Sequence, residues 1–380
     1  MKLNSKLPKV GTTIFTVMSQ LANEHQAINL SQGFPNFDGS AKLRELVYNY
    51  MSKGFNQYAP MPGVPALRSK LASKAESLYG AKVDMDKEIT ITTGATQAIF
   101  TAITAFIKPG DEVILIEPAY DSYRPSVEVN GGVPVTYELS APDYKIDWRH
   151  LRKIITFKTR MIIINTPLNP IGRIFSEDDM RELEKITDGT DILILSDEVY
   201  EHLVYDGLEH HSVLKYPKLY ERSLATFSFG KTFHNTGWKM GYCIAPEHLM
   251  KEFRKVHQFN VFSVNHPIQL AIADFLDDPN EYLSLNNFFQ QKRDFLLKSL
   301  EGSRLKPLPC EGTYFQLFDY SAISDEKDTE FAIRMTKEFG VAAIPVSVFY
   351  SSGKDEKVIR LCFAKTEELL AQAGELLKKM

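Results

Sequence analysis

The feature that most constrains this fold is a series of short, apolar, β-branched segments between residues 88 and 245, separated by helical stretches and turns. Continuous apolar strands of this length are typical of a sheet whose two faces are both covered by helices. The pattern therefore predicts an α/β fold with a parallel or mostly parallel central sheet. The predicted strands are 88–93, 112–117, 133–139, 160–165, 191–196, 223–228 and 241–245, with helices at 96–107 and 177–186.

The character of the sequence changes near residue 275. We predict one long amphipathic helix over 281–300, shorter strands at 314–318, 341–344 and 358–363, and a terminal helix that carries its leucines on one face. This arrangement indicates a smaller α+β domain that follows the larger one.

Charge and cysteine content exclude several classes of protein. The net charge of −4 over 380 residues gives no basic patch for nucleic acid or an acidic membrane. Cys243, Cys310 and Cys362 lie far apart with no CxxC pair, which favours neither a disulfide framework nor a metal site. The first residues lack the apolar stretch of a signal peptide, and no apolar run reaches the roughly 18 residues of a membrane span. We expect a cytoplasmic protein without a metal.

Polar side chains follow the predicted strands at the edge where α/β proteins bind their ligands. Taken singly, each has an ordinary structural explanation: a solvated loop lysine, a helix cap or a turn former. Together they would place an amide, a carboxylate, a phenol, a hydroxyl and two amines at one end of one sheet. The residues are Asn169, Asp197, Tyr200, Ser228, Lys231 and Lys239.

This combination of groups fits pyridoxal 5'-phosphate. Lys231 leaves a buried strand through a glycine turn, where desolvation makes an amine usable for Schiff-base chemistry. Asp197 would pair with a protonated ring nitrogen, and Asn169 and Tyr200 would contact the ring's phenolic oxygen. The helix start after Gly94, with Ser228 and Lys239, would bind the phosphate.

Other ligand and catalytic motifs are absent from the sequence. Neither GxGxxG nor GxxxxGK[ST] occurs, which removes the main support for a nicotinamide dehydrogenase or a P-loop protein. GxSxG and HExxH are missing as well. The His210-His211 pair has no partner at metal-ligand spacing, and we interpret it as part of a solvated loop.

The sequence resembles the class I/II aminotransferases of pyridoxal phosphate fold type I, in the branch of kynurenine–glutamine transaminases and bacterial methionine aminotransferases. The resemblance covers nearly the whole chain. It departs from the common family pattern at Lys239, where arginine is frequent, and at Ile171, where threonine is frequent. The segments that carry it are 11–16, 29–37, 56–60, 165–172, 196–200, 228–241, 310–315 and 359–363.

The resemblance implies a role for each matching residue. Lys231 would form the Schiff base and move the proton, and Tyr120 would stack on the ring. The backbone of Ala95 and Thr96 would join Ser228 and Lys239 at the phosphate. Tyr58 would reach the phosphate of the other subunit, so the site would require a homodimer.

Substrate recognition is implied in the same way. Arg360 would clamp the substrate carboxylate with help from Gly33 and Asn169, while Phe15, and Phe262 of a second subunit, would wall the side-chain pocket. The family's small domain includes the N-terminal segment. The implied division is therefore 1–40 with the small domain, 41–275 as the large cofactor-binding domain, and 276–380 as the small C-terminal domain.

The expected activity is transfer of the amino group of methionine or aromatic amino acids to a 2-oxo acid. A cysteine-S-conjugate β-lyase would need the same residues and stays open as the alternative. A cofactor-sensing transcriptional regulator would need an additional basic DNA-binding module, and only about thirty residues precede the Gln32-Gly33 motif.

Overall fold

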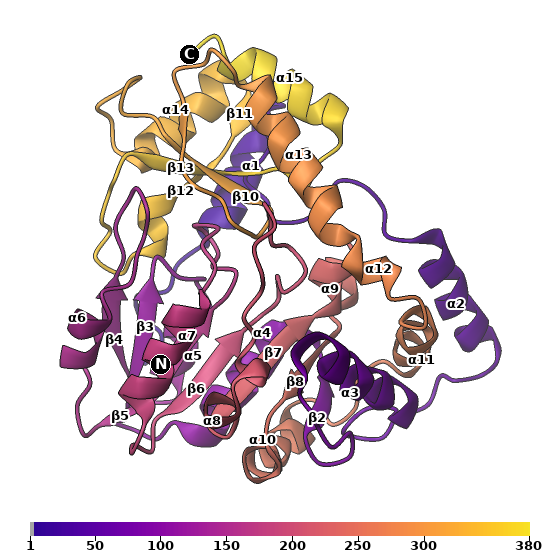
Figure 1. Cartoon of the computed structure of the whole chain (residues 1–380). Helices are drawn as coiled ribbons and strands as arrows, with labels where there is room; N and C mark the ends of the chain where they lie inside the picture. Colours follow the sequence, from indigo (N-terminus) through magenta and orange to yellow (C-terminus); the bar gives the residue numbers. More distant parts are fainter. Residues whose placement is uncertain (1–3) are drawn as a thin grey trace.

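The large part of the molecule is built on one seven-stranded sheet (Figure 1). The computed structural model describes residues 4–380. The strand order is β2-β8-β7-β6-β5-β3-β4, and β8 alone runs opposite to the other strands of this sheet. The strands are β2 (Ile89–Thr92), β3 (Glu112–Glu117), β4 (Val133–Glu138), β5 (Thr159–Asn165), β6 (Leu193–Asp197), β7 (Ser223–Ser228) and β8 (Gly241–Ile244).

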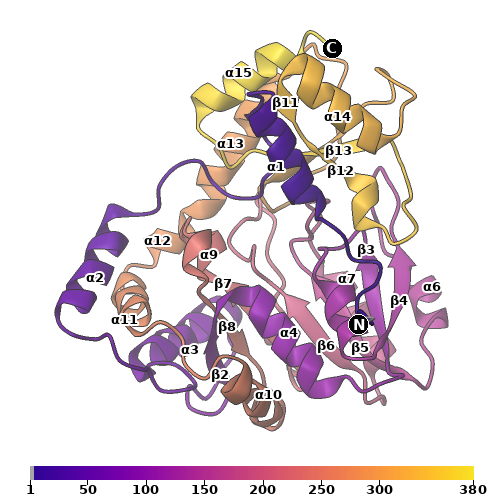
Figure 2. The same cartoon turned by 180° about the vertical axis from the view of Figure 1, so that it is seen from behind.

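Helices cover both faces of this sheet. α7 and α8 lie in front of it in Figure 1, whereas α4 and α10 lie in front of it in the reversed view of Figure 2. The helices of this part are α2 (Ala41–Ser52), α3 (Pro65–Tyr79), α4 (Gly94–Phe106), α5 (Tyr123–Val129), α6 (Trp148–Lys153), α7 (Glu177–Thr187), α8 (Pro217–Tyr220), α9 (Phe229–Thr232), α10 (Glu247–Asn260) and α11 (His266–Phe275), with 3₁₀ turns η1 (Val213–Lys215) and η2 (Thr236–Trp238).

The double covering explains why the strands read as unbroken apolar runs. On β3, Val113 and Leu115 pack into the cluster under α4 and α10, while Ile114 and Ile116 pack into the cluster on the opposite face. Side chains alternate between the faces of a strand, so every position of a doubly covered strand is buried. The mostly parallel α/β sheet predicted from the sequence is confirmed.

The smaller part contains a four-stranded sheet, order β12-β13-β10-β9, and a two-stranded pair of β1 with β11. Here the two ends of the chain meet, because Ile28 and Asn29 pair in parallel with Val341 and Ala342, and α1 packs on α14. The elements are α1 (Ile14–Glu24), β1 (Ile28–Asn29), α12 (Asn280–Leu283), α13 (Leu285–Ser299), β9 (Lys306–Pro307), β10 (Phe315–Asp319), α14 (Asp328–Phe339), β11 (Val341–Ala342), β12 (Ile344–Pro345), η3 (Val346–Phe349), β13 (Val358–Cys362) and α15 (Glu367–Leu377).

Two predicted elements of this part are wrong in detail. The single helix over 281–300 is two helices, α12 and α13, separated at Ser284, whose hydroxyl bonds back to the carbonyl of Asn280 at 2.7 Å. The single strand over 341–344 is divided between β11 and β12, which belong to different sheets. The division of the chain at residues 40 and 275 stays a prediction.

Candidate active site

One cavity of about 340 Å³ lies at the carboxyl ends of β5, β6 and β7, between the large sheet and the smaller part. It is lined by most of the residues that the sequence singled out. Those among its lining residues are Phe15, Gly33, Ala95, Thr96, Tyr120, Asn169, Asp197, Tyr200, Ser228, Lys231, Lys239 and Arg360. Thus segments from across the chain meet at one point, as expected for a ligand site at this edge of an α/β sheet.

Lys231 projects into this cavity from α9, a single turn that follows β7. The Ser228 hydroxyl caps the turn by accepting from the Lys231 backbone amide at 3.3 Å. The Lys231 amine donates to the Tyr314 hydroxyl at 2.8 Å and to the Gly33 carbonyl at 3.1 Å. Burial lowers the pKa of Lys231 to about 8, and the positive charge of Arg360 acts in the same direction. A fraction of this amine is therefore neutral near pH 7 and can act as a base or a nucleophile.

Asp197 is the last residue of β6 and is almost fully buried. Burial raises the pKa of its carboxyl group to about 6, although a hydrogen bond from the Tyr123 hydroxyl at 2.5 Å opposes that rise. The backbone amide of Val199 donates to the other carboxylate oxygen at 3.3 Å. The carboxylate is fixed in place with no cationic partner in ion-pair contact among residues 4–380, so it can receive a positively charged ligand atom.

Asn169 is held by the turn that follows β5. Its backbone amide donates to the Asn165 side chain at 2.8 Å, and the Asn165 amide group donates to the Asp197 carbonyl at 2.8 Å. The Asn169 side-chain oxygen accepts from Arg360 at 2.8 Å. The turn therefore links the ends of β5 and β6 and aims a fixed amide at the cavity, as the sequence predicted for Asn169. Tyr200 lies buried beside it, and its ring meets that of Tyr314 edge-on at 5.2 Å.

The start of α4 forms part of the cavity wall and offers an anion site there. No side chain caps this helix, so its first backbone amides are free to bind an anion. Gly94 has a φ of +76°, and a Cβ at that position would lie 3.7 Å from the Lys239 amine. The absence of a side chain there keeps a cradle open between the helix start and Lys239. The cradle is completed by Ala95, Thr96 and Ser228.

Arg360 on β13 is a fully buried cation without a carboxylate partner within ion-pair distance in the described chain. Its guanidinium lies 3.8 Å from the centre of the Phe315 ring and 5.4 Å from that of Phe15. It donates to Asn169 and, at 3.0 Å, to the Ser31 carbonyl, while its Nε has no hydrogen-bond partner among residues 4–380. Burial lowers the pKa of Arg360 to about 10. A buried, uncompensated guanidinium that faces a cavity is suited to bind a carboxylate.

Gly33 approaches this region by its backbone. A Cβ on Gly33 would lie 2.7 Å from the Phe315 ring, so only glycine lets residues 31–34 pack this closely against β10. Tyr120 is half-buried in the cavity wall, and burial raises the pKa of its phenol.

Tyr58 and Phe262 are the two predicted residues that do not line this cavity. Their side chains are 79% and 43% exposed, and their rings contact each other edge-on at 5.3 Å. Within this chain, neither residue contributes to the site. Their predicted contribution to the site of a second subunit stays a prediction.

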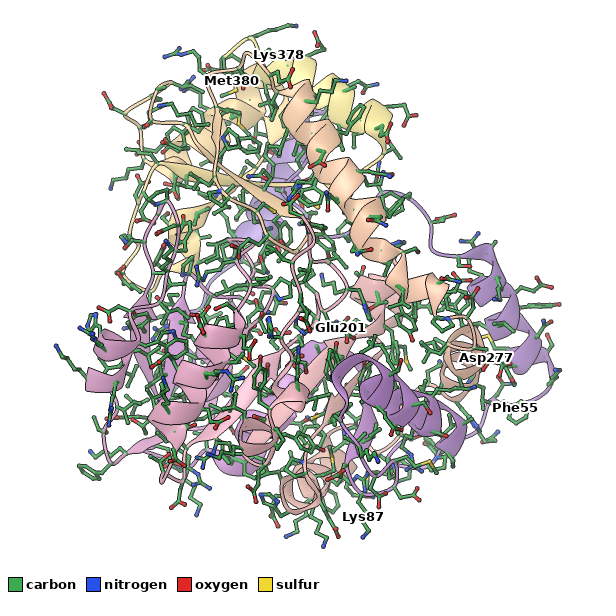
Figure 3. All side chains as sticks on the ribbon, in the orientation of Figure 1. Phe55, Lys87, Glu201, Asp277, Lys378 and Met380 are labelled. Carbon is green, nitrogen blue, oxygen red and sulfur yellow. The ribbon has the colours of Figure 1, made fainter. Side chains whose placement is uncertain are left out.

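A buried polar network supports the segment that carries Asp197 and Tyr200. Glu201 lies in the interior of the molecule (Figure 3) and accepts from Lys74 at 2.5 Å and from Tyr79 at 2.5 Å. Glu198 accepts from the Val213 backbone amide and contacts His210 at 3.0 Å. The interpretation of the histidine pair as a solvated loop is therefore wrong. His210 is buried and pairs with the carboxylate of Glu198, which lies 12 residues earlier in the chain. His211 is half-buried and contacts the Tyr216 hydroxyl.

Sequence reasoning missed three residues that hold the site together: Tyr123, Asn165 and Tyr314. Tyr123 follows Tyr120 by three residues at the start of α5, and Asn165 ends a predicted strand, so both positions carried a local signal. Tyr314 lies in segment 310–315, which carries the resemblance, but nothing local indicated its role, because it reaches Lys231 and Gly33 only through the packing of the smaller part on the sheet.

Metal binding and membrane crossing find no structural support in the described chain. Within residues 4–380, no cluster of three His, Cys, Asp or Glu side chains has an arrangement that could hold a metal ion. In the same range, no helix has both the length and the apolar character that a membrane crossing requires. The three cysteines are buried and unpaired with one another.

A mostly parallel α/β sheet with a lysine, a carboxylate, an uncapped helix start and a buried arginine around one cavity defines an enzyme of the aminotransferase type. The chain belongs to the class I and II aminotransferase family, whose model matches residues 25–377.

Among its relatives, the methionine aminotransferase of Escherichia coli (strain K12) is 51% identical over 377 residues, which cover 99% of this chain and 98% of that protein. Human kynurenine–oxoglutarate transaminase 1 is 35% identical over 395 residues, covering 95% and 94% of the two chains. The crystal structure of E. coli YbdL, described with a methionine aminotransferase function, matches with a TM-score of 0.98 at 51% identity and covers 100% of both chains. N-succinyldiaminopimelate aminotransferase from Mycobacterium tuberculosis matches with a TM-score of 0.95 at 34% identity over 100% of both chains.

Proposed function

We propose that this aminotransferase binds pyridoxal 5'-phosphate through Lys231 and transfers the amino group of methionine and of aromatic amino acids to a 2-oxo acid. The observation that carries the proposal is that the Lys231 amine and the uncompensated Arg360 guanidinium line the same cavity. A reactive amine and a carboxylate clamp are what amino-group exchange between amino acids and oxo acids requires.

The residues around the cavity fit the cofactor. The open cradle at Gly94, with the uncapped start of α4 and Lys239, suits a phosphate group. The buried Asp197 carboxylate suits a protonated ring nitrogen, and Asn169 and Tyr200 suit the phenolic oxygen. When bound, pyridoxal phosphate supplies an aldehyde carbon and an electron-withdrawing ring.

The protein's own groups would bind, orient and move protons. Arg360 would hold the substrate carboxylate by two parallel hydrogen bonds, with Asn169 fixing the guanidinium. Lys231, with a pKa of about 8, would take the proton from the substrate Cα and deliver it to the C4′ carbon of the cofactor. A positioned base of this kind contributes about two to four orders of magnitude in rate.

The preference for methionine and aromatic side chains is supported by the apolar part of the cavity wall. It contains Phe15, Ile99, Val199, Met240 and Phe315. Besides Lys231, the cations that line the cavity are Lys239 and Arg360. Lys239 is assigned to the cofactor phosphate and Arg360 to the α-carboxylate of the substrate. A dicarboxylic substrate would therefore place its second carboxylate against hydrocarbon.

We also propose that a second copy of this chain completes the site. Tyr58, Phe262 and Phe259 are exposed aromatic residues, and Phe259 is 91% exposed. Phe55, another exposed aromatic residue, lies at the edge of the molecule near α2 (Figure 3). An exposed aromatic surface of this kind is typical of a protein interface. Sedimentation of the purified protein at twice the chain mass would support the homodimer, and a monomer that retains full activity would contradict it.

The visible absorption spectrum of the purified protein tests the activity. A band that disappears once upon addition of L-methionine, in proportion to enzyme, and returns with a 2-oxo acid supports the aminotransferase. A band that persists while methionine is consumed and ammonia accumulates identifies the β-lyase instead. The Lys231→Ala variant is the control and should lack the band. A higher kcat/KM for aspartate than for methionine would contradict the substrate preference.

A further inference from the structure

Tyr314 contacts the Lys231 amine but is not among the residues that line the cavity. It is fully buried. Its hydroxyl lies 2.8 Å from the Lys231 amine and 2.5 Å from the Gly33 carbonyl oxygen. The amine also donates to that same carbonyl at 3.1 Å. The three groups thus form a closed triangle beside the cavity, and two of its corners, Lys231 and Gly33, line the cavity.

The direction of these hydrogen bonds follows from the chemistry of the groups. The Gly33 carbonyl can only accept, so the Tyr314 hydroxyl donates its proton to Gly33. Burial raises the pKa of Tyr314 well above its usual value, which keeps this proton on the phenol. The lone pairs of the phenol oxygen are then free to accept from the Lys231 amine.

Ring packing fixes the position of that oxygen. The Tyr314 ring meets the Tyr200 ring at 5.2 Å and the Phe315 ring at 4.9 Å, both nearly perpendicular, and lies 5.9 Å from Phe289. A ring enclosed on three sides cannot rotate its hydroxyl away from Lys231 without moving these neighbours. The acceptor is therefore preorganised.

We propose that Tyr314 is a positioning residue for Lys231, whose hydroxyl oxygen holds the amine when that amine is protonated and unattached. Because the Tyr314 hydroxyl also donates to the Gly33 carbonyl, it links the position of the Lys231 amine to the N-terminal segment at residues 31–34. The inference rests on the proposed role of Lys231 as the residue that moves the substrate proton, and it goes beyond that role because Tyr314 is not among the residues that line the cavity.

The charges around the amine make this acceptor important. The Arg360 and Lys239 cations disfavour a protonated Lys231, while the Asp197 carboxylate favours it. Cys362 on β13 also faces the amine. Within residues 4–380, the hydrogen-bond acceptors of the Lys231 amine are the Tyr314 hydroxyl and the Gly33 carbonyl. Removing the hydroxyl leaves one acceptor for a buried ammonium group.

The test uses the cofactor-free protein and the variant Tyr314→Phe, which deletes one oxygen and keeps the ring. Lys231 is titrated by competitive labelling with acetic anhydride, followed by mass spectrometry of its peptide. We expect the labelling midpoint of Lys231 to fall by roughly one pH unit in the variant, because the protonated amine loses a charge-assisted hydrogen bond. An unchanged midpoint would overturn the proposal.

Tyr205→Phe is the matched control. Tyr205 is also fully buried and donates to a backbone carbonyl of the same loop, that of Thr313, but it has no hydrogen bond to Lys231. Removal of the Tyr205 hydroxyl should leave the labelling midpoint of Lys231 unchanged. An equal shift in both variants would mean that loosening of the loop at residues 313–314, and not the loss of the Tyr314 oxygen, changes the labelling midpoint of Lys231.

Kinetics of the loaded enzyme give a second readout. Because Tyr314 does not line the cavity, Tyr314→Phe should lower kcat roughly tenfold and leave KM for methionine within about twofold. A rise in KM with unchanged kcat would also overturn the proposal. If Lys231→Ala retains amino transfer, the proposed function fails. If Lys231 proves essential but the labelling midpoint does not move in Tyr314→Phe, only this inference fails.

Discussion

Replacing Arg360 by methionine should abolish activity without destabilising the protein. Most buried arginines are structural, and truncating one that is ion-paired costs about 3–5 kcal/mol. Arg360 differs because it is buried among the rings of Phe15, Phe315 and Phe349 with no carboxylate within ion-pair distance in the described chain. Methionine has a flexible apolar side chain that packs well against aromatic rings.

The size of the effect follows from the pKa of Arg360. Burial lowers it from its ordinary value to about 10. At about 1.36 kcal/mol per pKa unit, the charged form is disfavoured in the folded chain by about 3 kcal/mol. This penalty is present in full at neutral pH, begins to fall as the pH rises through about 10, and disappears only above the ordinary pKa of arginine. Arg360→Met removes it and loses the hydrogen bonds to Asn169 and Ser31, at about 1 kcal/mol each. The balance is about 1 kcal/mol in favour of the variant.

Thermal melting of the cofactor-free proteins at one protein concentration is the assay. We expect the Tm of Arg360→Met to equal that of the parent or to exceed it by about 2 °C. The matched control is Arg293→Met. Arg293 is similarly buried, but its guanidinium binds both carboxylate oxygens of Asp206, at 2.6 and 2.7 Å. Because the Asp206 carboxylate is about half exposed, losing this pair should cost roughly 1–2 kcal/mol, and the variant should melt about 2–4 °C lower. An equal loss in both variants would refute the reasoning, because it would show that the Arg360 charge is compensated.

Three further variants test the site and its scaffold. Tyr123→Phe removes the hydrogen-bond donor that opposes the raised pKa of Asp197, so the pKa of Asp197 should rise above about 6 by roughly one unit. The acid limb of the pH profile of kcat/KM for methionine should therefore move to higher pH, and an unmoved limb would contradict this. Gly33→Ala would bring a Cβ within 2.7 Å of the Phe315 ring, and kcat/KM should fall roughly tenfold to a hundredfold, measured beside the melting temperature. Ser176→Ala breaks the capping box at the start of α7, which should cost about 1 kcal/mol of stability in denaturant titrations and leave kcat and KM unchanged.

The sheet could be predicted from the sequence because its strands are buried on both faces. β3 and β7 begin and end at the predicted residues, and the other predicted strands of the large sheet differ by one or two. The errors arise where tertiary structure overrides a local pattern. The apolar stretch over 341–344 is uniform, yet its first half pairs with β1 and its second half with β13. Nothing in a run of buried residues marks the point where a chain passes from one sheet to another.

The residues of the site likewise include some that local sequence could predict and some that it could not. Residues at strand ends, such as Asp197 and Asn169, could be predicted because parallel strands end at one edge. The supporting contacts could not. Tyr314 and Gly33 are 281 residues apart, and Lys74 and Glu201 are 127 apart. These pairs form through the packing of distant elements, and no spacing within the chain encodes them.

The contact between Ser31 and Arg360 spans 329 residues and sets an order of assembly. The cost of closing a loop grows only slowly with its length, but contacts of long range form late in folding. Synthesis proceeds from the amino end, so the lysine of the cavity exists well before the arginine. The lysine alone is not yet reactive, because the burial that lowers its pKa and the acceptors that hold its amine come from residues 31–34 and from the smaller part. The reactive amine and the carboxylate-binding arginine therefore arise from the same packing of the N-terminal segment and β13 on the large sheet.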